Sequence, residues 1–159
     1  MSKGEIVPES AVRFVRDFDA PPSKVWAFLT ESRLLPEWYG DGAIEPREGG
    51  RVSLMGGHIR GVLTGLRPEK FLAYSWNVFQ PGEAVSKWPV TYLEFTLDGS
   101  RLMLIHRPIP QAMQNQTMMG WHTMRDLMEA GLRGEHLKRA DLFSKNATLY
   151  GVDIANLKK

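Results

Sequence analysis

One histidine in this chain stands in a position where it could do chemistry. His106 lies in the stretch "LIHRP", at the end of a run of alternating apolar residues, so we predict that its side chain faces the interior. A buried imidazole can anchor a ligand carbonyl or hydroxyl, act as a general base if its pKa stays near neutral, or merely hydrogen-bond a neighbouring backbone group. No carboxylate partner stands nearby in the sequence, which favours the anchoring and structural interpretations over catalysis.

Arg16 is the second candidate. It has the same strand parity as Phe14 and Phe18, so its side chain could face the interior. An interior guanidinium would need a carboxylate partner or an anionic ligand. The alternative is that its stem lies along the sheet edge with the charge in water.

Other sites are not supported by the residue types. The spacing of His58, His122 and His136 does not match a metal site, and His122 is expected to be solvated. Cysteine is absent, which excludes disulfides and thiol catalysis. The stretch "REGGRVSLMGG" has paired glycines but no P-loop ending, so turns or bulges explain it better. We therefore predict no metal and no cofactor.

The elements that would position these residues can be read from periodicity and prolines. Alternation around Val12–Phe18 predicts a first strand, and Pro21-Pro22 precedes a short helix around Lys24–Leu29. A second small helix is broken by Pro36. A block of strands without intervening helices follows and indicates antiparallel hairpins, hence an α+β fold. The expected strands are 43–46, 51–56, 59–66, 70–78, 90–97 and 101–107.

Two hairpins define which residues face inward. A turn at Asp98-Gly99 would pair Thr91 with His106 and Phe95 with Leu102. One face then carries His106 and an apolar set, whereas Glu94 and Arg107 point outward. The apolar set is Leu93, Phe95, Leu97, Leu102 and Leu104.

In the second hairpin, "RPEK" is the turn, and Leu63 would face Tyr74. The same register sets Gly61 opposite Trp76 and Gly65 opposite Leu72. Glycines opposite large residues leave room for them and allow the sheet to bend.

A long helix near the C-terminus would close the fold. Asn115 is its expected N-cap and Gly134 its expected end, with Arg125, Asp126 and Glu129 on the polar arc. Two interior glycines suggest a close approach to the sheet, and methionines suit a wall that adapts to a guest. These patterns leave open whether the apolar arc fills a core or lines a pocket. The arc comprises Gly120, Trp121, Met124, Leu127, Met128, Gly131 and Leu132.

Composition narrows the class of protein. Of 159 residues, 43% are hydrophobic and 24% charged, as in an ordinary globular domain. The formal charge of +2 is scattered without a dense basic run, which argues against nucleic-acid binding. No apolar window is long enough for a membrane span and no signal-peptide core precedes the first strand, so a cytoplasmic protein is expected.

Six stretches in order carry a resemblance to a known family. They are "RDFDAPPSKVWAFLT", "LPEWYG", "REGGRVSL", "RGVLTGLRPEKFLAYSW", "LIHRP" and "GWHTMRDLMEAGL". The chain resembles the bacterial branch of the family named for the activator of the heat-shock-protein-90 ATPase (AHSA), in the START/polyketide-cyclase (SRPBCC) superfamily. The resemblance covers about residues 12–133 of one domain, 1–159, and leaves 134–159 as a C-terminal extension.

This resemblance implies a helix-grip fold, in which a curved antiparallel sheet of about six or seven strands wraps a long C-terminal helix. Two short helices after the first strand would close one end. Members commonly bind apolar small molecules in a cavity between sheet and helix. The family pattern has aromatic and histidine positions at Trp38, Trp76, His106 and Trp121. The expected ligand-binding residues are Trp38, Tyr74, Trp76, Thr91, His106, Trp121, Met124 and Met128.

Three functions follow as alternatives. The leading one is non-enzymatic binding of an apolar or amphipathic small molecule. The second, implied by the family name alone, is a protein-interaction role that stimulates a chaperone ATPase through an exposed surface. The third is a cyclase- or hydrolase-like enzyme, which would need a second polar group such as Arg16 or Glu94 beside His106. Trp26 is expected to be a packing residue, and Trp88 to lie at the cavity rim or cap the sheet edge.

Overall fold

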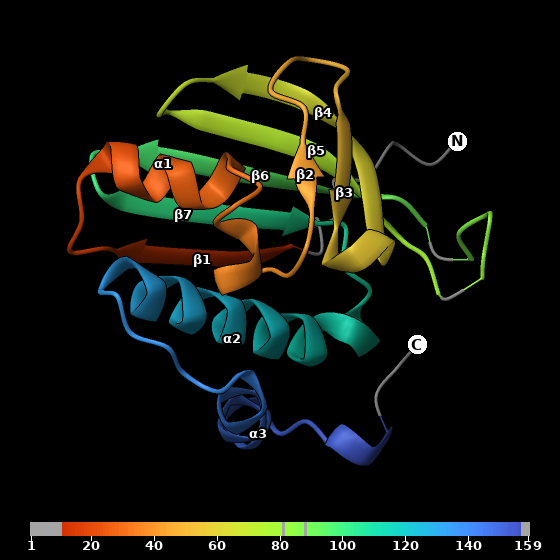
Figure 1. Ribbon diagram of the computed structural model, residues 1–159. Coiled ribbons are helices and arrows are strands. Elements are labelled where there is room, and N and C mark those ends of the chain that lie inside the picture. The colour runs from red at the N-terminus through yellow and green to blue at the C-terminus, as the bar shows by residue number, and fades with distance from the viewer. Residues whose placement is uncertain (1–10, 81, 88, 157–159) are drawn as a thin grey trace, which may run out of the picture.

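Seven antiparallel strands form one curved sheet in the computed structural model, which describes residues 11–80, 82–87 and 89–156 (Figure 1). The strand order is β1-β7-β6-β5-β4-β3-β2, so each strand from β2 to β7 lies beside its sequence neighbour and β1 closes against β7. This confirms the predicted α+β fold. The strands are β1 Val12–Asp17, β2 Ala43–Ile44, β3 Arg51–Leu54, β4 Ile59–Arg67, β5 Phe71–Val78, β6 Thr91–Asp98 and β7 Arg101–Arg107.

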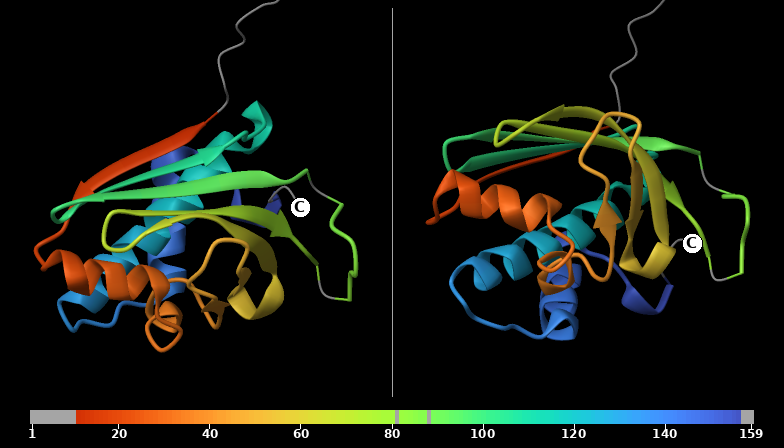
Figure 2. Two further views of the ribbon diagram at one scale, coloured as in Figure 1. Left: turned by 90° about the horizontal axis from the view of Figure 1, so that it is seen from above. Right: turned by 45° about the horizontal axis from the view of Figure 1, so that its top comes forward.

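Helices cover one face of this sheet. The long helix α2, Gln114–Leu132, crosses the concave face, and α1, Pro22–Thr30, covers the same face towards one end (Figure 2). A third helix, α3, Arg139–Tyr150, packs on the side of α2 away from the sheet. None of the described helices is both long and apolar enough to cross a membrane. Four 3-10 turns complete the elements: η1 Leu35–Glu37, η2 Met55–Gly57, η3 Gln111–Met113 and η4 Ile154–Asn156.

Prolines explain the start of both small helical segments. Pro22 is the first residue of α1 and Pro36 lies in the first turn of η1, where a missing N–H has no helical partner to lose. These two segments are the predicted short helices after the first strand. The apolar side of α1 is buried against the core through Val25, Phe28 and Leu29.

The predicted register of the β6–β7 hairpin is wrong by two residues. Asp98 pairs with Arg101, so the two-residue turn is Gly99-Ser100, not Asp98-Gly99. His106 consequently lies opposite Leu93, not opposite Thr91. An error of two residues leaves every side chain on its expected face, because the side-chain period of a strand is two. His106 is therefore buried, as predicted.

The β4–β5 hairpin contains a bulge that the sequence did not reveal. Leu63 pairs with Tyr74 as predicted, but the register shifts by one residue between Leu63 and Gly65. Gly65 lies opposite Ala73 and not opposite Leu72. A bulge bends its strand and strengthens the local twist, which helps the sheet to curve around α2.

The long helix differs from the prediction at its start and at its glycines, whereas Gly134, with a φ of 74°, directly follows its C-cap as predicted. Its N-cap is Met113, which makes no side-chain cap, so Asn115 is not the cap. A methyl group at Gly120 would meet open space, whereas one at Gly131 would press on the ring of Phe28. The predicted approach of both glycines to the sheet is therefore wrong: only Gly131 is constrained, and its neighbour is α1.

Candidate functional site

An aromatic cluster occupies the space between the sheet and the first half of α2. Trp76, from β5, lies 5.3 Å from Trp121 of α2 and 4.9 Å from His106 of β7, measured between ring centroids. The cluster is part of the continuous hydrophobic core of the described residues. Every ring in the cluster is buried, and none exceeds the 9% exposure of Trp76. The cluster comprises Trp38, Tyr39, Tyr74, Trp76, Phe95, His106 and Trp121.

His106 is the centre of a hydrogen-bond chain within the cluster. The indole Nε1 of Trp121 donates to Nδ1 of His106 at 3.0 Å, and an indole can only donate. Nδ1 must therefore carry a lone pair, which places the imidazole proton on Nε2. Nε2 lies 2.7 Å from the hydroxyl of Thr91 and donates to it, while the hydroxyl donates to the carbonyl oxygen of Trp76 at 3.3 Å. The predicted proximity of Thr91 and His106 is thus real, through a diagonal contact.

Burial fixes the charge state of this histidine. Desolvation lowers the pKa of His106 to about 3, because its charged form would lack water. The imidazole is therefore neutral near pH 7, and its basic nitrogen is occupied by Trp121. None of the described carboxylates hydrogen-bonds to it. Glu94 lies on the other face of the sheet, as predicted. There it pairs with Arg107.

Two phenols form a second buried polar pair. The hydroxyls of Tyr39 and Tyr74 lie 3.0 Å apart, and burial raises the pKa of both above the usual value, so both stay neutral. Beside them, Nε1 of Trp38 donates to the carbonyl oxygen of Phe28 at 2.7 Å. All three side chains are almost completely buried. The interior therefore holds several polar atoms that are satisfied by one another.

Met124 and Met128 extend this surface along α2. They follow Trp121 at three- and seven-residue spacing, on the helix side that faces the sheet, and both are buried. All eight residues predicted to bind a ligand thus belong to one continuous interior region. Two hollows in the described surface lie elsewhere: one on the outside of β3 and β4, and a smaller one lined by Trp26 and Leu72 between α1 and the sheet. Trp26 otherwise packs against the core, as expected.

Arg16 does not reach the aromatic cluster. Its guanidinium bonds to Asp126 at 3.0 Å and to Glu129 at 2.9 Å, both on α2. Arg125 lies beside them with its guanidinium 4.6 Å from the ring centre of Phe14. Burial, and to a smaller extent the charge of Arg16, lowers the pKa of Arg125 to about 10. These four charged residues, Arg16, Arg125, Asp126 and Glu129, form what we call the charged cluster.

His122 and His58 each have a hydrogen-bond partner, whereas His136 is exposed. His122 was predicted to be solvated. Its Nδ1 instead lies 2.9 Å from the hydroxyl of Tyr150 on α3. Nδ1 of His58 lies 2.7 Å from the carbonyl oxygen of Phe79. Within the described residues, no group of three potential metal ligands comes together. Trp88 lies outside the described residues.

The sequence interpretation missed two members of the aromatic cluster. Tyr39 follows Trp38 directly, and its ring lies 5.9 Å from Trp76 and 5.8 Å from Trp121. Phe95 was placed on the inward face but not in the site, although its ring lies 6.1 Å from Trp121. Strand parity could have indicated Phe95. Tyr39 lies in the irregular segment after η1, where periodicity carries no signal.

The comparison with protein families decides the relationship. Residues 19–133 match the model described as Activator of Hsp90 ATPase homolog 1-like protein. The chain belongs to this family. The matched residues run from just before α1 to the end of α2 and therefore include every member of the aromatic cluster. No protein with a curated description matches the chain in sequence.

Solved structures share the fold of this Hsp90-activator-like chain. CalU16 from Micromonospora echinospora is 20% identical, with a TM-score of 0.70, over 89% of this chain and 85% of that one. MLL2253 from Mesorhizobium loti is 25% identical, with a TM-score of 0.68, over 80% and 99%. PFC0360w from Plasmodium falciparum, described as an HSP90 activator, is 18% identical, with a TM-score of 0.53, over 64% and 74%. These likenesses support the helix-grip architecture.

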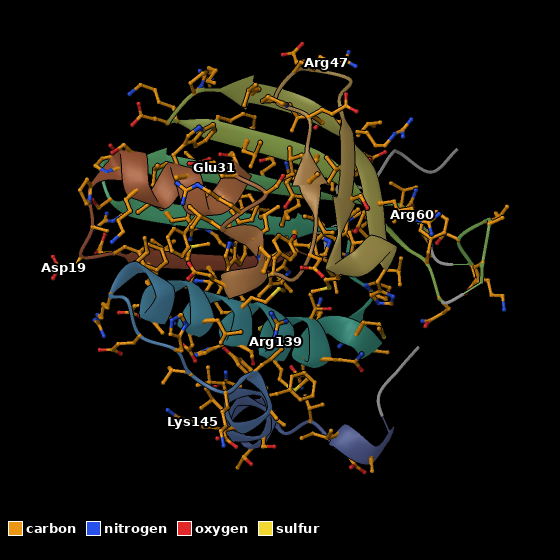
Figure 3. All side chains as sticks on the ribbon, in the orientation of Figure 1. Asp19, Glu31, Arg47, Arg60, Arg139 and Lys145 are labelled. Carbon is orange, nitrogen blue, oxygen red and sulfur yellow. The ribbon has the colours of Figure 1, made fainter. Side chains whose placement is uncertain are left out.

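One contact links the segment after the family match to the aromatic cluster. Nη2 of Arg139, the first residue of α3, donates to the carbonyl oxygen of Trp38 at 2.9 Å. The side chain of Arg139 lies where α3 approaches α2 (Figure 3). Burial lowers the pKa of this guanidinium from its ordinary value. The extension thus contacts the backbone that carries one of the cluster rings.

Proposed function

We propose that the protein binds an apolar or amphipathic small molecule between the sheet and α2, at the aromatic cluster together with Thr91, Met124 and Met128. One observation carries the proposal: a neutral imidazole is buried among aromatic rings with a hydrogen bond on each nitrogen. A neutral imidazole offers one donor and one acceptor, so a guest carbonyl can replace the Thr91 hydroxyl at Nε2, and a guest hydroxyl or N–H can replace the Trp121 indole at Nδ1. Burial of the guest's apolar surface supplies about 25 cal/mol per Å².

Binding requires the rings to separate, because they contact one another directly. Trp121 is the side chain whose displacement frees the acceptor nitrogen of His106. The methionines that follow it on α2 can repack around different shapes, since their thioether chains are flexible. In this mechanism the guest takes the place of the indole and donates a hydrogen bond to Nδ1 of His106.

The backbone beside the cluster supports such movement. Met55 in η2 has a φ of 51°, which is strained for a residue with a side chain, and Gly40 has a φ of 122°. The two segments touch: the amide of Gly56 donates to the carbonyl oxygen of Asp41, and Met55 packs against the core. Gly40 directly follows Tyr39, so a change in this strained contact would shift a cluster ring.

A neutral apolar fluorophore, N-phenyl-1-naphthylamine, tests the proposal. Its fluorescence should rise saturably with protein, and Trp121→Phe, which removes the indole donor, should alter the affinity. The matched variant Trp26→Phe lies outside the cluster and should bind as the parent does. Native mass spectrometry of freshly purified protein should in addition reveal a co-purified guest. Absence of saturable binding by the folded protein, with no co-purified mass, would refute the proposal.

Catalysis by His106 has little support. Its lowered pKa makes the imidazole a weak base, its Nδ1 lone pair already accepts from Trp121, and Arg16 and Glu94 are paired with other residues. The cyclase- or hydrolase-like alternative therefore lacks its second polar group.

A chaperone interaction remains the second candidate, favoured by the family match and by the HSP90 activator among the structural relatives. This role would use an outer surface and leave the aromatic cluster closed. Stimulation of the ATPase rate of a purified Hsp90-type chaperone by this chain is the expected result, with Trp121→Phe leaving it unchanged. A chaperone whose rate does not respond to the added chain would remove this candidate.

A further inference from the structure

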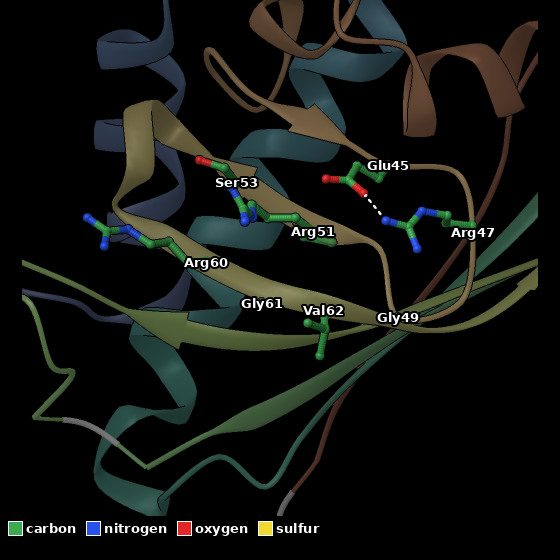
Figure 4. A pocket seen from close by; sticks show the side chains of 9 residues that line it. Glu45, Arg47, Gly49, Arg51, Ser53, Arg60, Gly61 and Val62 are labelled. Atoms are coloured by element: carbon green, nitrogen blue, oxygen red, sulfur yellow. Dashed lines mark hydrogen bonds and ion pairs between the residues drawn. The ribbon is translucent and has the colours of Figure 1, made fainter.

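A hollow of about 470 Å³ lies on the outside of β3 and β4, on the face of the sheet opposite the aromatic cluster (Figure 4). Its polar lining comes from three arginines, one glutamate and one serine. Glycines and valines supply the rest of the surface. The lining residues are Glu45, Arg47, Gly49, Arg51, Val52, Ser53, Arg60, Gly61 and Val62.

Strand pairing brings the polar side chains to one face. Arg51 and Ser53 are two residues apart on β3, and Ser53 pairs directly with Arg60 on β4. Arg51 and Arg60 are thus diagonal neighbours across the pair, within reach of each other for long side chains. Arg51 extends along its strand towards Ser53, with Arg60 on one side and Arg47 on the other (Figure 4). Like charges in this arrangement repel one another unless an anion lies between them.

The arginines differ in how they are held. Arg60 donates from Nε to the carbonyl oxygen of Gly57 at 2.9 Å, and its guanidinium lies 4.3 Å from the ring centre of Phe79. These contacts orient Arg60 without neutralising it. Arg47 forms an exposed pair with Glu45. Among the described residues, neither Arg51 nor Arg60 has a carboxylate partner, so the hollow carries an excess of positive charge.

Gly61 lies in the lining of the hollow, where β4 packs closely against β5. A methyl group at this position would overlap the carbonyl oxygen of Ser75 on the neighbouring strand. The adjacent amide of Val62 donates to the hydroxyl of Ser75 at 2.9 Å, which holds β4 against β5. Only glycine fits at this position, and the close pairing of β4 with β5 holds Arg60 and Val62 in place at the hollow.

We propose that this hollow binds a phosphate monoester through Arg51, Arg60 and the hydroxyl of Ser53. Guanidinium groups match the geometry of phosphate oxygens and form short, charge-assisted hydrogen bonds with them. A phosphate alone is much smaller than the hollow, so the remaining space accommodates the organic part of the ligand beside Val62. The phosphate group can belong to a soluble ester or to a lipid headgroup.

Titration of the full chain with glycerol 3-phosphate, followed by calorimetry and amide chemical shifts, tests this site. Shifts should be confined to β3, β4 and the preceding turn. Arg51→Gln and Arg60→Gln should each weaken binding roughly tenfold, since each removes a charge-assisted hydrogen bond. Arg33→Gln changes an exposed arginine paired with Glu31 far from the hollow and should leave the affinity unchanged.

Vesicles separate the two sources of phosphate. Binding to phosphatidic acid vesicles without binding to glycerol 3-phosphate would assign a lipid headgroup, whereas the reverse would assign a soluble ester. Acetate that binds as tightly as the phosphate ester would overturn the proposal. Absence of binding in both arms up to about 10 mM phosphate would also overturn it. Trp121→Phe should not alter phosphate binding, so failure at one site leaves the other untouched.

Discussion

The two faces of α2 are both largely buried, but they are built from different chemistry. On the sheet side, Trp121 donates to a neutral His106 among aromatic rings. On the side towards the edge strand β1 and α3, Asp126 and Glu129 bind Arg16 of β1, and Asn146 of α3 donates to Asp126 at 3.3 Å. One face thus uses neutral donors and acceptors, and the other uses full charges.

Solvent access explains the difference. The side chains of Arg16 and Asp126 keep 18% and 20% exposure, so water still stabilises their charges. Trp121 and His106 are 1% and 3% exposed, where an unpaired charge would be very unfavourable. The lesson is that burial on the sheet side selects polar groups that can be satisfied while neutral. The following predictions, from the largest expected effect to the smallest, test this contrast.

Removal of the Trp121 indole should produce the largest loss of stability. Trp121→Ala creates a cavity and leaves Nδ1 of His106 without its donor, so we expect the free energy of unfolding to fall by about 3–5 kcal/mol. Urea unfolding followed by circular dichroism measures it. Trp26→Ala, on a partly buried ring of α1, should cause a smaller loss. Equal losses would show that Trp121 is no more tightly packed than the partly buried Trp26 of α1.

Acid should weaken the sheet side through His106. Its pKa is about 3 in the folded state against an ordinary value of 6.5, so below pH 6.5 the unfolded chain binds a proton that the folded chain does not. This stability is fully present above pH 6.5 and is lost as pH falls. Between pH 7.5 and pH 5 the loss should be about 2 kcal/mol.

Urea unfolding at each pH measures this loss in the parent and in His106→Gln, which should lack this component. His136→Gln, at an exposed histidine, is the control and should keep the parent's slope. A parent and His106→Gln with the same pH dependence would contradict the neutral, buried imidazole.

The stability that the charged cluster contributes should depend on salt concentration. A double-mutant cycle with Arg16→Gln and Asp126→Asn should give a coupling of about 1 kcal/mol that shrinks in 1 M NaCl, because partly exposed charges are screened. The exposed pair Arg101–Asp17, with 61% and 70% exposure, should couple much more weakly. A coupling that does not change with salt would remove the distinction between the two faces.

The smallest effect concerns the link between α3 and the aromatic cluster. Arg139→Gln shortens the donor to the carbonyl oxygen of Trp38 and should lower the free energy of unfolding by about 0.5–1 kcal/mol. Acrylamide should then quench tryptophan fluorescence more strongly. Lys145→Gln, on an exposed part of α3, should change neither measurement. Unchanged quenching in Arg139→Gln would show that α3 does not restrain the cluster.

Much of the fold could be predicted because its signals are local. Strand alternation, the prolines at positions 22 and 36 and the apolar arc of α2 indicate the elements and their inward faces. Even with the turn wrongly placed at Asp98-Gly99, the side chains of β6 and β7 were assigned to the correct faces of the sheet, because the register error was two residues. The bulge near Gly65 could not be foreseen, since it depends on how β4 bends over β5.

The site was predictable only in part, because its contacts join distant elements. Parity placed His106 inside, but its bond to Trp121 depends on the rotation of α2 about its axis. Arg125 was expected on a solvated arc and is instead 5% exposed beneath its neighbours. The packing of α3 against α2 could not be predicted from an apolar stripe. The only described residues of α3 that are fully buried are Asn146 and Ala147, which form no such stripe.

The indole proton that Trp121 donates to His106 can serve as a spectroscopic probe of the protein interior. The indole N–H of Trp121 points at an aromatic nitrogen, whereas that of Trp38 points at a carbonyl oxygen. Isotope-labelled protein should therefore show the Trp121 indole resonance apart from that of Trp38. A change in the chemical shift of this resonance on adding a compound would show that the compound affects the aromatic cluster. The measurement needs neither a mutation nor a dye.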